Sequence, residues 1–384
     1  MPRADTSGQS GAASTLLPPS SSGEIASLNG IRALAVALVF LSHGGQGQLV
    51  PGGLGVTLFF VLSGFLITTL MQREYRKHGA IHLRNFYLRR VLRLMPPLLI
   101  VVALSGVLAA ASLIDGGFSL RGLLSVLFYF GNYHVIATDF GGIPAGLGVI
   151  WSLAVEEHYY LLYPPLALLL LRWQRPRRAA AALVALCVAI LLWRSWLYLH
   201  GVPEAYLTMA TDTRADAILI GCAMAFLWNP APRALPAPQP RRDLPIAVAC
   251  ALLLAATLLY RNETFRLTLR YTLQCLALAP LILLAIIHAR SPAVRWLNAR
   301  PLVYIGTVSY TIYLSHQVVL YGVIRHWPQL NWAATLVLTL ALTLALAEPM
   351  RRWIEVPCAE LRRRLHQRTQ QKSPEPAAFN GATP

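Results

Sequence analysis

The chain has 384 residues, of which 56% are hydrophobic and only 13% are charged, and its formal net charge is +17. This composition excludes an ordinary soluble domain and predicts an all-α, polytopic membrane protein. The basic residues fall in short segments between apolar runs, so the positive charge indicates membrane topology and not a nucleic-acid-binding face. The five cysteines show no spacing typical of a metal site or a disulfide framework.

The first 24 residues are rich in Ser, Gly and Pro and lack the apolar stretch of a signal peptide, so we predict a disordered tail over 1–24. A membrane domain is predicted over 25–360, and a basic and then polar tail over 361–384. The membrane domain contains eleven apolar runs, which lie near 28–45, 53–71, 94–114, 120–137, 149–171, 179–199, 214–228, 244–260, 269–289, 302–324 and 332–349.

Clusters of basic residues between the runs indicate how the chain crosses the membrane. If all of them lie in the cytoplasm, an even number of crossings separates each pair of clusters. Three runs lie between the clusters at 73–93 and 172–178, so one of the three does not cross. The run at 120–137 is the shortest and most aromatic of the three. We therefore predict a bundle of about ten transmembrane helices, with a re-entrant or interfacial helix at 120–137 and with both termini in the cytoplasm.

The first run carries Arg32 near its start and His43 near its end. Eleven residues of helix return to nearly the same face, about 16 Å further along the axis. Polar and charged side chains are costly inside lipid, so the pair indicates a functional role or a buried polar network. The alternative is that Arg32 reaches one interface and His43 caps the other.

A pair of carboxylates, Glu156 and Glu157, follows Trp151 at the outer start of a predicted helix. This places Glu156 at a depth similar to that of His43. A carboxylate beside an imidazole can orient the ring and stabilise its protonated form, which predicts an acid–base pair. The alternative is a pair of glutamates that faces water.

Arg89, Arg90 and Arg93 lie on the cytoplasmic side, just before the run at 94–114. Guanidinium groups bind phosphate through paired hydrogen bonds, so the cluster is a candidate site for a phosphate-bearing compound. The alternative is an anchor against anionic lipid.

Three further polar residues interrupt later runs. Arg214 and Asp216 are two positions apart and do not share a helix face, so we expect each to pair with another helix. His316 lies in the run at 302–324, and both direct chemistry and a hydrogen-bonded structural role are open for it.

Seven segments, in this order, resemble the acyltransferase-3 family of integral membrane acyltransferases. They are LNGIRALAVALVFLSH, GGLGVTLFFVLSGFLITTL, FYLRRVLRLMPPLL, WSLAVEEHYYLLYP, TRADAILIG, IGTVSYTIYLSHQ and RRWIEVP, and they cover most of residues 28–357. The resemblance implies about ten transmembrane helices and transfer of an acyl group, often acetyl, from cytoplasmic acyl-CoA. It implies an acceptor on the far side of the membrane, typically a sugar hydroxyl of a glycan or polysaccharide and in some members a small molecule.

The resemblance also assigns roles to individual positions. Asn29 departs from the family pattern, which usually has Asp there, so a charge that could pair with Arg32 is missing. No SGNH hydrolase-like domain follows the membrane part, so a relay through such a domain would need a separate protein. The matching residues are Arg32 and His43 for the R-x10-H pair, Arg89, Arg90 and Arg93 for the arginine motif, Glu156 for the acidic residue, and Arg214 and Asp216 for R-x-D.

We therefore predict a membrane O-acyltransferase of the bacterial inner membrane. Its donor substrate would be acyl-CoA, most simply acetyl-CoA, with the phosphates near the arginine cluster and Arg32. His43 would deprotonate the acceptor hydroxyl or accept the acyl group itself, with Glu156 as its partner. Acceptor contacts are expected from 139–148 and 200–213. We expect no permanently bound cofactor, no metal and no nucleic-acid partner, and contact with membrane lipid; the sequence does not indicate an oligomeric state.

A different class of protein also fits these residues. In a transporter or flippase for a glycan precursor, His43, Glu156 and His316 would form a proton relay. The two functions differ in one observable, because a transporter leaves acyl-CoA intact.

Overall fold

The structure, a computed structural model, describes residues 27–47, 49–228 and 237–372. Every regular element in these ranges is a helix, which confirms the predicted all-α class. The predicted disordered tail over 1–24 lies outside the described residues, as do residues 373–384 of the predicted C-terminal tail.

Seven helical segments are long and apolar enough to cross a membrane. They include α1 (Leu28–Leu41) with its π-helical extension η1 (Ser42–Gln46), α2 (Gly52–His78), α3 (Leu83–Ala110), α7 (Pro176–Leu199), α10 (Pro240–Leu259), α12 (Leu269–Ile287), and the continuous stretch of α15 (Trp332–Met350), η4 (Arg351–Glu355) and α16 (Val356–Lys372). Three other helices, α6 (Ile150–Arg172), α9 (Thr211–Leu227) and α14 (Ser309–His326), are shorter or more polar and run among them.

The helix α9 lies at the centre of the bundle, and all of its residues from Asp216 to Phe226 are buried. Its closest neighbour is α2. A Cβ atom added at Gly221 would lie 2.1 Å from the carbonyl oxygen of Val61, and one added at Gly64 would lie 1.9 Å from that of Ile218. Small residues on both helices therefore allow the two backbones to touch, as is usual where membrane helices pack closely.

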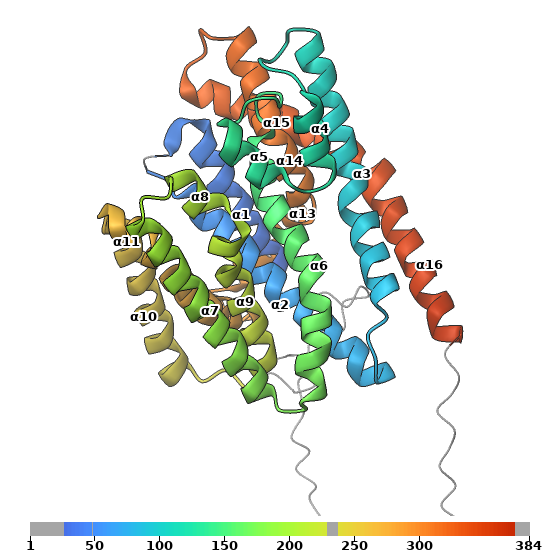
Figure 1. Cartoon of the computed structure of the whole chain (residues 1–384), viewed down its shortest axis with the longest axis vertical. Helices are drawn as coiled ribbons and strands as arrows, with labels where there is room; N and C mark the ends of the chain where they lie inside the picture. Colours follow the sequence, from blue (N-terminus) through green and yellow to red (C-terminus); the bar gives the residue numbers. More distant parts are fainter. Residues whose placement is uncertain (1–26, 48, 229–236, 373–384) are drawn as a thin grey trace, which may run out of the picture.

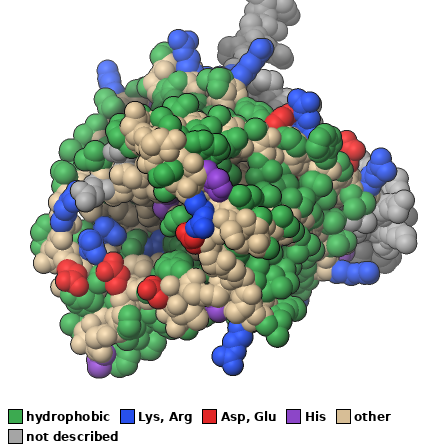
Figure 2. Space-filling view, turned by 90° about the horizontal axis from the view of Figure 1, so that it is seen from above, with side chains coloured by type: hydrophobic (Ala, Val, Ile, Leu, Met, Phe, Trp, Pro, Cys, Tyr) green, Lys and Arg blue, Asp and Glu red, His purple; other side chains and the backbone are tan. Residues whose placement is uncertain are grey.

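Short helices lie at one end of the bundle, between the top and the left side of Figure 1. They are α4 (Leu120–Leu127), α5 (Gly131–Thr138), α8 (Glu204–Met209) and α11 (Glu263–Leu267). We call this the short-helix end. The connections α2–α3 and α6–α7 lie at the opposite end, as does the start of α10, and they carry the basic clusters, so we call it the basic end. Seen from above, the short-helix end is hollowed (Figure 2).

The run at 120–137 forms two helices, α4 and α5, of eight residues each. Each is about 12 Å long, far less than the roughly 30 Å of a bilayer core. As predicted, this run does not form a spanning helix.

The run at 302–324, predicted as one helix, is instead divided. It forms α13 (Arg300–Thr307) and α14, with a break at Val308. A Cβ atom at Gly306 would lie 1.9 Å from the carbonyl oxygen of Asn29, so α13 packs directly on the backbone of α1. The chain bends after this contact and enters the bundle as α14. The remaining short elements are η2 (Leu147–Val149) and η3 (Arg295–Asn298).

Candidate active site

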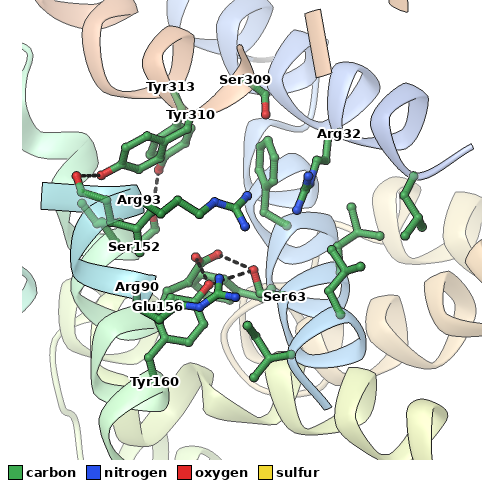
Figure 3. Close-up of a pocket in the computed structure, with 18 of the residues that line it drawn as sticks. Arg32, Ser63, Arg90, Arg93, Ser152, Glu156, Tyr160, Ser309, Tyr310 and Tyr313 are labelled. Carbon is green, nitrogen blue, oxygen red and sulfur yellow. Dashed lines mark hydrogen bonds between the residues drawn. The ribbon is translucent and has the colours of Figure 1, made fainter. Parts of the chain in front are cut away.

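A cavity of about 260 Å³ lies between α1, α2, α3, α6 and α14. Its wall is apolar over much of its area, but several polar side chains lie together on one side (Figure 3). The charged and hydroxyl-bearing residues that line it include Arg32, Ser63, Arg73, Arg90, Arg93, Ser152, Glu156, Tyr160, Ser309, Tyr310 and Tyr313. We call this the arginine cavity.

The guanidinium groups of the arginine cavity are largely without protein partners. Arg32 and Arg93 turn toward one another (Figure 3) and make no hydrogen bond or ion pair with any residue that the structure describes. Arg90 stacks on the rings of Phe86 and Tyr160, at 5.6 and 5.4 Å from the ring centroids. Arg90 and Arg93 share a face of α3 because they are three residues apart.

Glu156 is the single carboxylate among the residues that line this cavity. It accepts hydrogen bonds from the hydroxyl groups of Ser63 at 3.1 Å and Tyr160 at 2.9 Å. Four arginines against one glutamate give the cavity a positive charge. Such an arrangement costs free energy through repulsion between like charges unless an anion occupies it.

One of the sequence expectations about this cluster needs correction. Arg89 does not line the cavity; it points to α2 and forms an ion pair with Glu74 at 2.8 Å. Arg73 of α2 lines the cavity instead, and sequence reasoning did not single it out. Helical spacing contained the signal, because Arg73 continues a stripe of cavity-lining positions on α2, namely Phe59, Ser63, Leu66 and Leu70.

His43 lies at the other end of the first helix and contacts α14. Its Nδ1 atom is 2.8 Å from Nε2 of His316, and the two rings are nearly parallel, with centroids 5.1 Å apart. His316 is 1% exposed, and its Nδ1 atom lies 2.8 Å from the carbonyl oxygen of Tyr313 and 3.1 Å from that of Ile312. His43 itself is exposed.

The expected pairing of His43 with Glu156 is wrong in this structure. His43 contacts His316, whereas Glu156 contacts Ser63 and Tyr160 in the arginine cavity. Glu156 lies deeper in the bundle than His43. The helix α6 begins at Ile150, and Glu156 is six residues, or about 9 Å, further along it. Glu156 therefore shares a cavity with Arg32.

A second cavity, of about 520 Å³, opens beside His43 at the short-helix end. We call it the histidine cavity. It is lined by His43, Asp115, Gly116, Phe140, Ile143, Pro144, Ala145, Gly146, Gly148, Val149, Trp151, Gln317 and Tyr321. Of the two segments expected to contact the acceptor, most of 139–148 lines this cavity, whereas no residue of 200–213 does.

The loop over the histidine cavity packs tightly on α14. Gly146 has a φ of +88°, and a Cβ atom there would lie 2.4 Å from the backbone nitrogen of Val318. Asp115 on the cavity rim forms an ion pair with Arg325 of α14. The loop thus has a fixed position beside His43.

One layer of side chains separates the two cavities. Trp151 lines the histidine cavity, and the next residue, Ser152, lines the arginine cavity. Tyr313 completes this layer: its hydroxyl oxygen is 2.5 Å from Oγ of Ser152 and donates to the carbonyl oxygen of Val149 at 3.2 Å. The ring of Tyr313 is 5.9 Å from that of His316.

Arg214 and Asp216 lie outside both cavities, in a buried network on α9. Each contacts another helix, as their spacing leads one to expect. Arg214 stacks 3.6 Å above the ring of Tyr271 on α12 and donates to Thr57 of α2 at 3.1 Å. Asp216 forms an ion pair at 3.1 Å with Arg194 of α7.

Arg194 was not predicted as a site residue, although it interrupts an apolar run and is 0% exposed. It donates to the carbonyl oxygens of Thr268 and Thr213 and to the hydroxyl group of Thr272. Thr272 in turn donates to Asp216 at 2.5 Å. This network joins α7, α9 and α12, and its contacts are those of a structural element.

The model of the acyltransferase-3 family, described as an acyltransferase domain, matches residues 25–348. The chain belongs to the acyltransferase-3 family. It is similar to peptidoglycan O-acetyltransferase OatA of Listeria monocytogenes, with 33% identity over 87% of this chain and 55% of the relative. A protein of Bacillus subtilis provisionally named peptidoglycan O-acetyltransferase YrhL is 31% identical over 77% of this chain and 48% of its own length.

A Staphylococcus aureus protein provisionally named an O-acetyltransferase is 28% identical over 87% of this chain and 57% of the relative. The chain spans about half the length of these curated relatives. No solved structure matches the chain. The family match identifies an acyltransferase domain, and seven of the described helical segments are long and apolar enough to cross a membrane.

Within this acyltransferase-3 protein, the arginine cavity and the histidine cavity are joined by one helix. The R-x10-H pair is formed by Arg32, which lines the former, and His43, which lines the latter. No group of three or more His, Cys, Asp or Glu side chains that could hold a metal ion occurs in the described part of the chain.

Proposed function

We propose that this acyltransferase transfers an acyl group, most simply acetyl, from cytoplasmic acyl-CoA to a hydroxyl group of a glycan at the outer side of the membrane. The observation that carries the proposal is the arginine cavity, in which Arg32 and Arg93 have no partner among the described residues. Phosphate groups are the anions that arginine binds best, because the guanidinium fork matches two phosphate oxygens.

The positive charge of the arginine cavity suits the phosphate groups of acyl-CoA. These phosphates would bind Arg32, Arg90 and Arg93 and offset their mutual repulsion. The pantetheine arm would extend along the apolar wall toward the layer formed by Ser152 and Tyr313. Beyond that layer lies His43, about 16 Å from Arg32 along the helix. Movement of the layer would bring the thioester to the imidazole.

The acceptor would enter the histidine cavity from the opposite side. There Nε2 of His43 would take the proton of the acceptor hydroxyl while its oxygen attacks the thioester carbonyl. The carbon–sulfur bond breaks, and the thiolate of CoA receives that proton from His43. In the alternative route, His43 attacks the thioester first and forms an acyl-imidazole, which the acceptor hydroxyl then cleaves. Either route yields an ester and free CoA.

We propose ten crossings for the membrane domain. The seven helical segments that are long and apolar enough to span are joined by α6, α9 and α14, which alternate with them in direction along the chain (Figure 1). The basic clusters support an orientation with the basic end in the cytoplasm and the short-helix end outside. In a bacterial cell this corresponds to the inner membrane, with the arginine cavity on the donor side.

The names of the relatives support a glycan acceptor. One of them is a peptidoglycan O-acetyltransferase, and the aromatic side chains Phe140, Trp151 and Tyr321 in the histidine cavity suit the apolar faces of sugar rings. We therefore propose peptidoglycan or a related polysaccharide as the acceptor class.

The test uses the purified full chain in lipid nanodiscs with ¹⁴C-acetyl-CoA and a soluble N-acetylglucosamine oligosaccharide as acceptor probe. We expect free CoA and a radioactive oligosaccharide ester, both lost in His43→Ala. The matched control is His326→Ala, which removes an exposed histidine from α14. Full activity of a correctly inserted His43→Ala protein would refute the assignment of His43.

The same measurement separates the enzyme from a transporter. A transporter would leave the thioester intact under all conditions, whereas the enzyme releases CoA. Rapid mixing with labelled acetyl-CoA in the absence of acceptor distinguishes the two chemical routes, because only the covalent route leaves label on the protein.

A further inference from the structure

The contact between His43 and His316 fixes where the protons of both rings lie. Nδ1 of His316 faces two backbone carbonyl oxygens, those of Tyr313 and Ile312. A carbonyl oxygen can only accept a hydrogen bond, so Nδ1 of His316 carries a proton. In a neutral imidazole the other nitrogen is then an acceptor, so Nε2 of His316 accepts.

The proton position on His43 follows from this. Its Nδ1 atom lies 2.8 Å from the accepting Nε2 of His316, and therefore it donates. Nε2 of His43 is left without a proton in the neutral pair. His43 lines the histidine cavity, and its Nε2 atom is not the one that contacts His316, so Nε2 is the ring nitrogen available to the cavity.

We propose that His316 is a positioning residue that holds His43 in the tautomer with a free Nε2 toward the acceptor. The inference rests on the proposed function, because the unprotonated Nε2 of His43 would accept a hydrogen bond from the acceptor hydroxyl. Its role is the one that a carboxylate performs in many acid–base pairs, where a third group orients the imidazole. Here a neutral ring takes the place of the carboxylate.

The side chains around the two histidines leave His316, and no carboxylate, as the partner of the His43 ring. Glu156 is held by Ser63 and Tyr160 in the arginine cavity. Asp115 lines the same cavity as His43 but forms an ion pair with Arg325. Phe40 packs on His316 with ring centroids 6.0 Å apart and offers no hydrogen bond. Among the described residues, His316 is the only hydrogen-bonding partner of the His43 ring.

The decisive measurement needs no variant of His316. Solid-state ¹⁵N NMR of the full chain, labelled at histidine and reconstituted in lipid at neutral pH, reports which nitrogen of each ring carries a proton. A difference spectrum against His43→Asn assigns the signals of His43. We expect protonated Nδ1 and unprotonated Nε2. A proton on Nε2 of neutral His43 would overturn the inference.

Activity measurements provide a second test. His316→Phe keeps the ring shape but removes the acceptor, and we expect kcat for acetyl transfer to fall by about 10²- to 10⁴-fold, the range seen for a misplaced general base. The Kd of acetyl-CoA should not change, because His316 does not line the arginine cavity. His316→Gln should recover part of kcat, since its amide oxygen can accept from Nδ1 of His43.

The control is His326→Phe on the same helix. Nδ1 of His326 also contacts a backbone carbonyl, that of Gly322 at 2.9 Å, but the ring is exposed and touches no other histidine. Its kcat should equal that of the wild type. Loss of activity in His43→Ala together with full activity in His316→Phe would refute only the positioning role, whereas full activity in His43→Ala would refute the proposed function itself.

Discussion

Replacing Arg93 by Gln tests the arginine cavity as a phosphate site. Arg93 makes no hydrogen bond or ion pair with the residues described by the structure, so the substitution breaks no internal hydrogen bond or ion pair. A hydrogen bond between charged groups contributes about 1.5–3 kcal/mol. We therefore expect the Kd of acetyl-CoA to rise by about 10- to 150-fold. Isothermal titration calorimetry of the protein in nanodiscs measures this change.

Two comparisons show whether the loss comes from phosphate binding. Acetyl-pantetheine carries the thioester but no phosphate, so Arg93→Gln should leave its Kd unchanged. Arg84→Gln, on an exposed position of the same helix, should leave the Kd of acetyl-CoA unchanged. Arg89→Gln should also have a small effect, because Arg89 pairs with Glu74 outside the cavity. An equal loss for both thioesters, or a larger loss for Arg89→Gln than for Arg93→Gln, would refute the reasoning.

Three further predictions concern the bundle and the layer between the cavities. Asp216→Asn leaves the guanidinium of Arg194 buried without its counter-charge, and we expect about 3–5 kcal/mol less stability, seen as a lower Tm in detergent. Gly221→Leu places a side chain where the α2 backbone lies, 2.1 Å from the carbonyl oxygen of Val61, and size-exclusion chromatography should show no folded monodisperse protein. Tyr313→Phe removes the hydroxyl that ties the layer together and should raise hydrolysis of acetyl-CoA without acceptor; unchanged hydrolysis would exclude a barrier role for this residue.

Composition and charge were sufficient to predict the fold class and the behaviour of the run at 120–137. Both follow from local properties, because apolar length determines whether a helix can span and the basic clusters constrain the number of crossings. The break between α13 and α14 was not predictable in this way. It lies beside the contact of Gly306 with the backbone of Asn29, which is far away in the sequence.

In the candidate site, too, the sequence did not predict which individual side chains contact one another. Grouping Arg89 with Arg90 and Arg93 was reasonable from proximity, but helix α3 turns Arg89 toward Glu74. The contact of His43 with His316 joins residues separated by 273 positions, and no local pattern connects them. The buried network of Arg194 could have been predicted from the sequence, because an arginine inside an apolar run is costly and needs a buried partner.

The spacing of Arg32 and His43 has a physical explanation in the two cavities. In the proposed function, a donor that enters from the basic end and an acceptor that enters from the short-helix end meet across the side chains that lie between the two cavities. A single helix that lines both cavities holds its two side chains at a fixed distance and on one face. Eleven residues satisfy both conditions, since they complete about three turns and span about 16 Å. A pair on two separate helices would depend on how those helices pack, whereas this pair depends on the geometry of α1 and its π-helical extension η1.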